Sequence, residues 1–256
     1  MAGIAEVGLQ AMFAMAREAV GQTVGFNDLM QQQILQALFE IVPLVAFDLF
    51  LWLLDDIDDV AERLDFLQAL REDLIEAIWK NNRVPPGVLA RLAKDADGKL
   101  KEMVAWHQNT PSEVLARFAE DEDFGIQEAV AHNHHTPPEI LSHLALSEST
   151  SVREGVVWNP NTPPEILTHL AVDIDTNVRE AVARNPRTSP EVLACLAGDE
   201  NHSVRSGVAL NDVTPQEILT RLAMDEQYTV RSAVARNQHT PPELLTCLAE
   251  NPETSV

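Results

Sequence analysis

The chain has 256 residues, 45% of them hydrophobic, which is enough to bury a sizeable core. Its formal net charge of −22 at pH 7 argues against nucleic-acid binding through the phosphates. The charge favours solubility and leaves two interpretations open, a solvated acidic surface or a surface for a basic partner. The Met1 end lacks the basic region of a secretory signal, so a cytoplasmic protein is expected.

Residues 1–79 show no repeat, and they are more acidic for their length than the rest of the chain. They form a first predicted domain, helical, apolar and acidic. Apolar periodicity predicts helices at Ile4–Val20, from Leu29 onward, and at Ile57–Leu64 and Phe66–Trp79.

The apolar run Ile34–Leu54 is long enough to span a membrane. It contains Glu40, Pro43 and Asp48, however, and two acids within a span are expensive. Two interpretations remain open for this run. It forms either buried helices of a cap or self-association domain, or a segment over residues 34–54 that contacts the membrane.

Residues 80–256 form a second predicted domain, which is built from repeats. A threonine recurs every 26 residues, and Val84 holds the same register one step earlier. Such a period is the signature of a solenoid, here with seven units, the last incomplete. The recurring threonines are Thr110, Thr136, Thr162, Thr188, Thr214 and Thr240.

Each unit predicts two short helices, as the stretch from Thr162 to Asn185 illustrates. Thr162 followed by Pro163 and Glu165 has the pattern of a capping box, so the threonine is the predicted N-cap of the first helix. The predicted caps of the second helices are Ser151, Asn177, Ser203 and Thr229. The residues of this unit predicted to be buried are Ile166, Leu167, Leu170, Ala171, Val178, Ala181 and Val182.

An asparagine follows nearly every second helix, and we call these positions the asparagine column. His107 alone departs from it. Because a buried polar group without a partner is costly, we expect the amides to satisfy backbone groups at the turn as a structural ladder. A functional row is the alternative. The column comprises Asn81, Asn133, Asn159, Asn185, Asn211 and Asn237.

The repeat resembles the leucine-rich repeat variant family through the stretches TPPEIL, HLAVD and NVREAVARNP. The resemblance covers residues 80–256 and implies an all-α, right-handed superhelical solenoid of paired short helices, one α and one nearer to 3₁₀. A known member of the family carries a cysteine cluster for an iron–sulfur centre ahead of its repeats. This chain has only Cys195 and Cys247, two units apart, so that role does not carry over and a reducing setting is expected.

Two further columns are charged and are spaced six residues apart, so they predict a structural ladder within and between units. If its pairs are exposed, each contributes only about 0–1 kcal/mol. A carboxylate-binding arginine row is the alternative. The acidic column is Asp95, Asp121, Asp173, Asp199 and Asp225, and the basic column is Lys101, Arg153, Arg179, Arg205 and Arg231.

Residue patterns typical of enzymes are missing from the sequence, which has no glycine-rich phosphate loop, GxSxG, HExxH or paired CxxC. His132, His134 and His135 lack the spacing of metal ligands. His143, His169 and Cys195 align on successive units, and units about 10 Å apart are too distant to share one ion. We therefore expect no catalysis, no cofactor and no metal site.

A column at the end of the second helices is aromatic and basic, and we call it the aromatic column. Its members are Trp106, His132, Trp158, Arg184, Leu210 and Arg236. Trp and Arg are favoured at protein interfaces, so we predict that Trp106, His132, Trp158 and Arg184 bind a partner. The alternative is that each Trp folds over the turn of its own repeat.

The expected function is a non-catalytic scaffold that binds another protein through the repeat surface. Two alternatives stay open: a membrane-associated or self-associating effector acting through residues 1–79, and an assembly factor of a larger enzyme or pigment complex. At the C-terminal end, the helix from Thr240 is expected to pack Leu244, Leu245 and Leu248 on the sixth repeat without an outer partner. The chain is then either a fragment or docks this end onto another copy or chain.

Overall fold

The structure, a computed structural model, describes residues 84–250. The chain divides into two compact units, Met1–Phe118 and Ala119–Val256, and each is described by itself. The predictions for residues 1–79, for the segment 34–54, for Asn81 and for the end at Val256 lie outside the described residues. They stay predictions.

The described part of the first unit is a short run of helices. Helix α6 packs against α7, and α7 packs against α8. Leu89, Leu92, Val104, Leu115 and Phe118 are fully buried within this group. The helices are α6 (Pro86–Asp95), α7 (Gly98–Trp106) and α8 (Ser112–Phe118).

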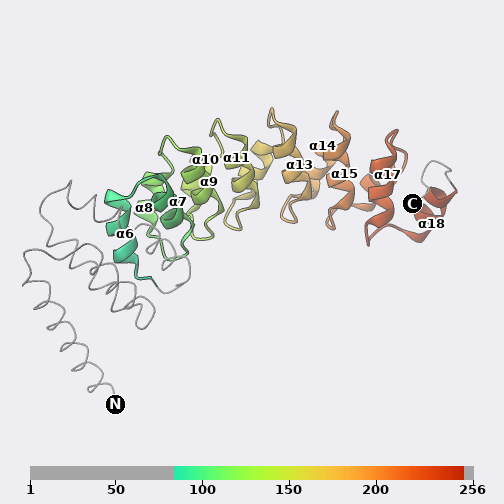
Figure 1. Cartoon of the computed structure of the whole chain (residues 1–256). Helices are drawn as coiled ribbons and strands as arrows, with labels where there is room; N and C mark the ends of the chain where they lie inside the picture. Colours follow the sequence, from blue (N-terminus) through green and yellow to red (C-terminus); the bar gives the residue numbers. More distant parts are fainter. Residues whose placement is uncertain (1–83, 251–256) are drawn as a thin grey trace, which may run out of the picture. The chain divides into compact units, whose positions relative to one another are not determined.

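The second unit repeats one pair of helices along its length (Figure 1). A nine-residue helix begins every 26 residues, a helix of seven residues lies between each successive two of these, and a helix of eight residues follows the last. The longer helices are α9 (Phe124–His132), α11 (Thr150–Trp158), α13 (Thr176–Arg184), α15 (His202–Leu210) and α17 (Tyr228–Arg236). The shorter helices are α10 (Pro138–Leu144), α12 (Pro164–Leu170), α14 (Pro190–Leu196), α16 (Gln216–Leu222) and α18 (Pro242–Ala249).

The longer helices form the main stack of this unit. Helix α11 packs between α9 and α13, and α15 packs between α13 and α17. The shorter helices α12, α14 and α16 each contact the two longer helices that flank them in the chain. Residues 84–250 contain no strand, so the predicted all-α repeat with a period of 26 residues is confirmed.

The buried faces predicted for the unit from Thr162 to Asn185 are also confirmed, whereas in α18 Leu248 is buried and Leu245, predicted to pack, is 39% exposed. In the pair α12 and α13, every residue predicted to be buried from Ile166 to Val182 is buried. These apolar side chains meet between a short helix and its neighbouring long helix. The core is therefore distributed along the array, as the repeated pattern predicts.

The capping role predicted for the recurring threonines is wrong. Thr136 and Thr162 lie one residue before the N-cap, a position that Pro137 and Pro163 occupy without a side-chain capping bond. Each threonine is buried, and its hydroxyl donates to the carbonyl of a valine six residues earlier, at 2.5 Å from Thr162 to Val156. The last carbonyls of a helix lack intrahelical donors, so the hydroxyl is directed back to the preceding helix.

The predicted caps of the second helices are displaced by two residues. The side chain of Asp175 accepts from the N–H of Asn177 at 2.8 Å, and that of Asn201 accepts from Ser203 at 2.8 Å. Asp and Asn bond the backbone two residues onward in this way, which places the N-cap at the earlier residue. Ser151 and Thr229 likewise lie inside their helices rather than at the cap.

The 3₁₀ character implied by the resemblance is confined to a helix end. Both helices of each described pair are α-helical. In α12, the carbonyl of Pro163 accepts from Ile166 at 3.0 Å and from Leu167 at 3.4 Å, so the first turn combines both bonding patterns.

Candidate functional site

The asparagine column connects successive repeats. Asn211 is buried, and its amide donates to the carbonyls of Ala183 at 2.8 Å and Asn185 at 2.9 Å, both in the preceding repeat. Its side-chain oxygen accepts from the N–H of Val213 at 3.1 Å. Asn159 and Asn237 make the equivalent bonds. These amides hold the stack together and close the turns, so both amide N–H donors are used within the fold.

His107 takes the place of asparagine in the first unit and keeps part of its role. It is buried, and its Nδ1 accepts from the N–H of Asn109 at 3.1 Å. This is the turn bond that the asparagine oxygen makes elsewhere. The departure at this position therefore has a structural reason rather than a metal-binding one.

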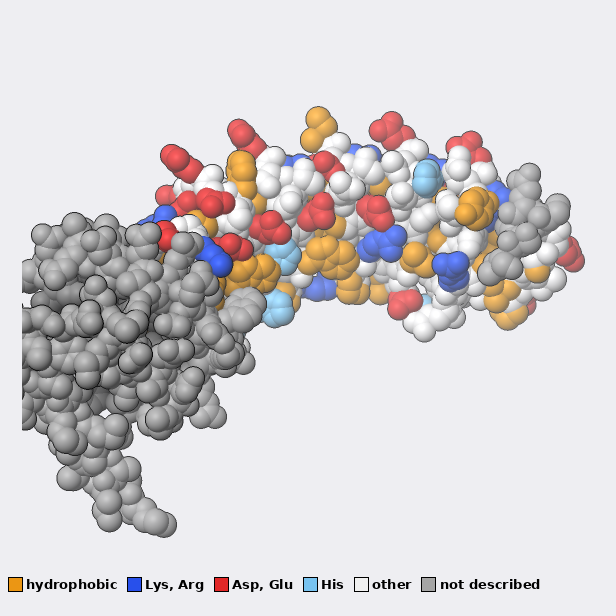
Figure 2. Space-filling model, in the orientation of Figure 1, with side chains coloured by type: hydrophobic (Ala, Val, Ile, Leu, Met, Phe, Trp, Pro, Cys, Tyr) orange, Lys and Arg blue, Asp and Glu red, His pale blue; other side chains and the backbone are white. Residues whose placement is uncertain are grey.

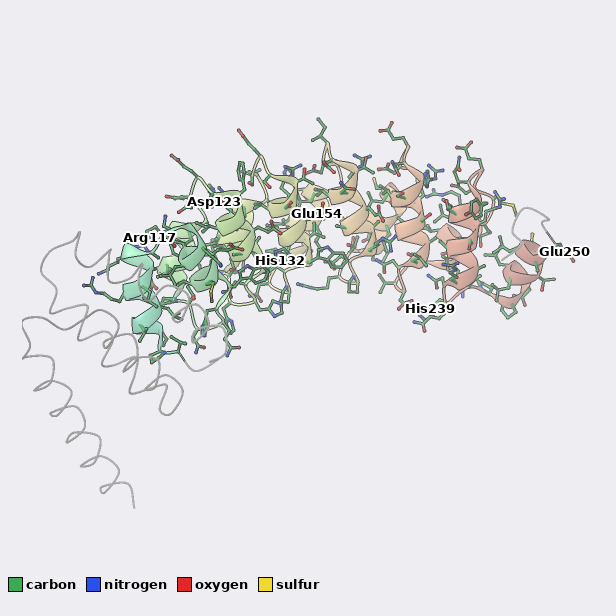
Figure 3. The ribbon with its side chains drawn as sticks, in the orientation of Figure 1. Arg117, Asp123, His132, Glu154, His239 and Glu250 are labelled. Carbon is green, nitrogen blue, oxygen red and sulfur yellow. The ribbon has the colours of Figure 1, made fainter. Side chains whose placement is uncertain are left out.

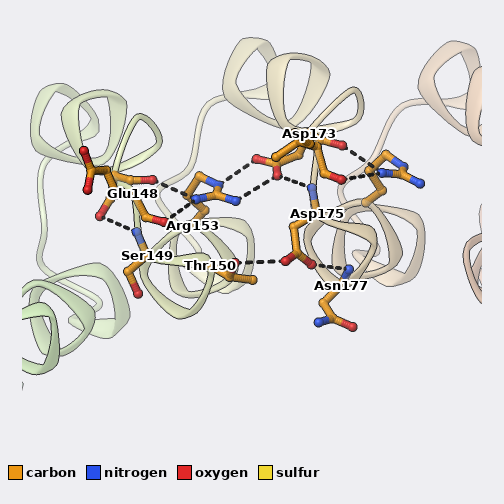
Figure 4. A network of polar contacts seen from close by, with 10 residues as sticks. Glu148, Ser149, Thr150, Arg153, Asp173, Asp175 and Asn177 are labelled. Carbon is orange, nitrogen blue, oxygen red and sulfur yellow. Dashed lines mark hydrogen bonds and ion pairs between the residues drawn. The ribbon is translucent and has the colours of Figure 1, made fainter.

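The charged columns form ion pairs between neighbouring repeats (Figure 4). Arg153 binds Asp173 of the next repeat through both carboxylate oxygens, at 2.7 and 2.9 Å. Its third nitrogen donates to the carbonyl of Ser147 in its own repeat at 2.8 Å. The same arrangement joins Arg179 to Asp199 and Arg205 to Asp225.

These pairs are largely buried, so the magnitude given for exposed pairs does not apply to them. Their arginine and aspartate side chains are only 8–12% exposed, because the loops of two repeats close over them. The hydrogen bonds that the Arg179 guanidinium donates to Asp199 raise the pKa of Arg179 above its usual value. Burial raises the pKa of Asp199, but the hydrogen bonds from Arg179 and the Asn201 N–H outweigh it, and the pKa is lowered. The ion pair thus favours the ionised forms of Arg179 and Asp199.

One repeat replaces the ion pair with a neutral pair. Gln127 stands in the basic column and Ser147 in the acidic column, and the serine hydroxyl donates to the glutamine side-chain oxygen at 2.9 Å. The Gln127 amide also donates to the carbonyl of Asp121 at 2.7 Å, as the arginines do to their own repeat. Both partners change together, which indicates that the column serves packing between repeats.

The aromatic column is the part of the predicted site that stays at the surface. Trp158 is 46% exposed at the end of α11, and Trp106 is 38% exposed at the end of α7, in the other compact unit. Arg184 binds Glu180 of its own helix at 2.9 Å. The His132 ring is half-buried, and its Nδ1 lies 3.0 Å from the carbonyl of Glu128.

Residues of this column lie over the next long helix. A methyl group added at Gly155 of α11 would come within 2.9 Å of the His132 ring. At Gly207 of α15 it would come within 3.3 Å of the Arg184 Cγ. The small residues let these side chains cross between neighbouring helices. The structure thus brings His132 against the helix that ends in Trp158, whereas Trp106 belongs to the other unit.

A row of glutamates shares this face, and the sequence predictions missed it. Glu128, Glu154 and Glu180 occupy the same position of α9, α11 and α13, one turn before the aromatic column. Glu154 and His132 are labelled in Figure 3. Burial and the charges of Asp175, Glu128 and Glu180 raise the pKa of Glu154. Figure 2 shows acidic side chains along the array with hydrophobic and histidine side chains beside them. The signal was present in the sequence as glutamate in three consecutive repeats.

The predicted histidine positions do not form a metal centre in the described part of the chain. Across residues 84–250, no three His, Cys, Asp or Glu side chains gather closely enough to hold an ion. His134, His135, His143 and His169 are exposed, as are the free thiols of Cys195 and Cys247. In the same residues, no helix is both long and apolar enough to cross a bilayer.

The comparisons with known proteins agree with this architecture. Residues 176–201 match the family model described as leucine rich repeat variant. Among solved structures, the chain is similar to "a leucine-rich repeat variant with a novel repetitive protein structural motif". The TM-score is 0.51, with 24% identity over 76% of this chain and 87% of that chain. No curated protein sequence matches the chain. Residues 176–201 therefore match the leucine-rich repeat variant family, and the chain is similar in fold to a solved structure of that name.

Proposed function

We propose that the chain is a non-catalytic protein-interaction scaffold whose second unit binds a basic partner on the exposed face of its long helices. The observation that carries the proposal is Trp158, a large aromatic ring left 46% exposed on a helix whose buried face already completes the stack. Folding gains little from the exposed part of this ring. Interfaces, by contrast, favour Trp at their centres.

The charges beside Trp158 define the class of partner. Glu154 lies one turn before it on α11, with Glu128 and Glu180 on the neighbouring long helices. Like charges held on one face are relieved when a cation approaches, and a Lys or Arg side chain is also attracted to the face of a Trp ring. We therefore expect a partner segment rich in Lys and Arg.

Binding of labelled basic peptides to the full-length chain, followed by fluorescence anisotropy, tests this proposal. Trp158→Ala should weaken binding about tenfold or more, with little change in the urea midpoint of unfolding. Met224→Ala is the matched control, because Met224 is an exposed apolar residue outside this face. If Trp158→Ala lowers the unfolding midpoint strongly and leaves binding unchanged, the ring is a packing element and the proposal fails.

A second experiment separates this function from the alternatives that involve residues 1–79. Partner capture by the full chain is compared with capture by a chain that lacks residues 1–79. Retention of the partner by the shortened chain supports the repeat surface. Loss of capture, with the Trp158→Ala variant of the full chain still active, would assign the function to residues 1–79 instead.

A further inference from the structure

One loop position of the second unit departs from the pattern of the repeat. The residues that share it are exposed, and all but one are glutamates: Glu122, Glu148, Ile174, Glu200 and Glu226. Ile174 is 94% exposed, so the fold gains almost nothing from its apolar side chain. Figure 2 shows acidic side chains along this edge of the array with a hydrophobic side chain among them. An apolar residue in this place needs another explanation than folding.

Ile174 forms one wall of a pocket between two successive repeats. The pocket is a shallow, open depression with a volume of about 610 Å³, and Leu146, itself 71% exposed, also lines it. The equivalent positions one repeat later hold Val172 and Glu200, and one repeat earlier Glu120 and Glu148. Among residues 119–250, long apolar residues therefore occupy both of these positions only at Leu146 and Ile174.

The floor of the pocket is already fixed by bonds within the protein. The Arg153 guanidinium lies between the carboxylate of Asp173 and the carbonyl of Ser147, at 2.7 and 2.8 Å. The Thr150 hydroxyl donates to Asp175 at 3.0 Å (Figure 4). An apolar group entering the pocket would break none of these bonds, and a preformed floor lowers the entropy cost of binding.

The rim of the pocket is acidic. Glu148 is exposed beside Leu146, and Asp175 follows Ile174 on the other wall. The only guanidinium that lines the pocket, that of Arg153, is neutralised by its ion pair. Such a rim attracts cationic groups and repels anionic ones, including an anionic membrane surface. The walls thus suit an apolar side chain, and the rim suits positive charges on either side of it.

We propose that the pocket between Leu146 and Ile174 binds a short segment of another protein that carries one apolar side chain beside Lys or Arg. This site is separate from the face of the long helices. Leu146 precedes α11, whereas Trp158 ends it, and a helix of nine residues separates its ends by about 12 Å. The two surfaces can therefore be tested independently on the same chain.

A displayed library of heptapeptides, each with a central Leu, Ile or Phe and random flanks, tests the proposal on the full-length chain. Ile174→Glu is the counter-selected variant, because it restores the residue that the other repeats carry at this position. We expect the selected peptides to be enriched in Lys and Arg. The best of them should bind Ile174→Glu and Leu146→Glu at least tenfold more weakly in fluorescence anisotropy. Met224→Glu, at the Leu146 position of a later repeat, should bind as the parent chain does.

Three results would overturn the proposal. The first is that no selected peptide distinguishes the parent chain from Ile174→Glu. The second is that replacing the central apolar residue of the best peptide with Asn leaves its affinity unchanged, because charge alone would then explain binding. The third is flotation of the chain with phosphatidylserine vesicles, lost in Ile174→Glu, in place of peptide binding. Equal peptide affinity of the parent chain and Trp158→Ala supports a site distinct from the long-helix face, and this result stands whether or not that face binds a partner.

Discussion

Replacing Asp199 with Ser should destabilise the array strongly, although it removes only one carboxylate. Asp199 is 9% exposed and holds the Arg179 guanidinium at 2.7 and 3.1 Å. Serine can still accept from the N–H two residues onward, as Ser147 does from Ser149 at 3.3 Å. It leaves the guanidinium without its counter-charge, however. Breaking a buried ion pair costs about 3–5 kcal/mol, and the slight exposure of this pair places the expected loss near about 3 kcal/mol.

The chain itself supplies a compensating change. Gln127 and Ser147 occupy the same two columns two repeats earlier in the chain, and a neutral hydrogen bond of 2.9 Å joins them. Arg179→Gln together with Asp199→Ser should therefore recover most of the loss. The double variant is expected to be about 1 kcal/mol less stable than the parent, near the net contribution of one hydrogen bond. The coupling between the two sites is then about 2 kcal/mol or more.

Urea unfolding followed by far-UV circular dichroism measures the free energy of unfolding of the parent chain, the two single variants and the double variant, which together form a double-mutant cycle. Hydrogen exchange of α13 and α15 localises the effect, because each repeat contributes its own stability and that of its interfaces. Glu200→Ser is the matched control, since it removes the same charge from an exposed neighbour and should change stability by less than about 0.5 kcal/mol. If the double variant loses as much stability as the two single variants combined, the ion pair is not coupled and the reasoning is refuted.

Two further outcomes are expected. Asn211→Ala removes two buried donors and one acceptor and should lower the free energy of unfolding in urea by about 3 kcal/mol. The control Asp212→Ala, at the exposed next residue, should lower it by less than about 0.5 kcal/mol. Equal losses in the two variants would contradict the structural role of the asparagine column. The pKa values of Asp199 and Asp225 are lowered in the folded protein, so the ionised carboxylates stabilise the fold. This stabilisation is complete above the usual pKa of 3.8 and is lost as the pH falls through the lower pKa values of the folded state. The contribution of Glu154 to the pH dependence of stability has the opposite sign. Its pKa is raised in the folded protein, so its ionisation destabilises the fold and this cost is relieved as the pH falls. Thermal unfolding should therefore show a loss of stability below pH 3.8 that is weaker in the Asp199→Ser, Arg179→Gln variant.

The period and the buried faces could be predicted because the same residue pattern recurs six or seven times in the chain. A threonine, a run of apolar residues and an asparagine return at fixed spacing, so a pattern shared by several units is not a chance match. The details of each unit were harder. The pattern Thr162, Pro163, Glu165 fits a capping box, but the hydroxyl instead bonds the carbonyl of Val156. A local motif cannot show that a carbonyl from the preceding helix lies within reach.

The ion-pair ladder shows a similar limit. The sequence predicted contacts within and between repeats without saying which carboxylate each arginine binds. Within its own repeat, Arg179 contacts Asp173 only through the carbonyl, at 2.9 Å. The carboxylate that neutralises it belongs to Asp199, 20 residues onward. Only the stacking of two repeats determines which partner lies closer and how deeply the pair is buried. For the same reason, the pocket beside Ile174 could not be predicted, although the isoleucine among glutamates was visible in the sequence.

Departures from the repeat are therefore the best guide to function in such an array. When Gln127 replaces the arginine, Ser147 replaces the matching aspartate, and the contact between repeats survives. When His107 replaces an asparagine, its ring keeps the turn bond. Both changes are compensated, so both belong to the fold. Ile174 and Trp158 have no such compensation, because each exposes apolar surface that no neighbour in the described chain covers. Folding leaves these two positions unexplained, and the binding that we propose for each would account for them.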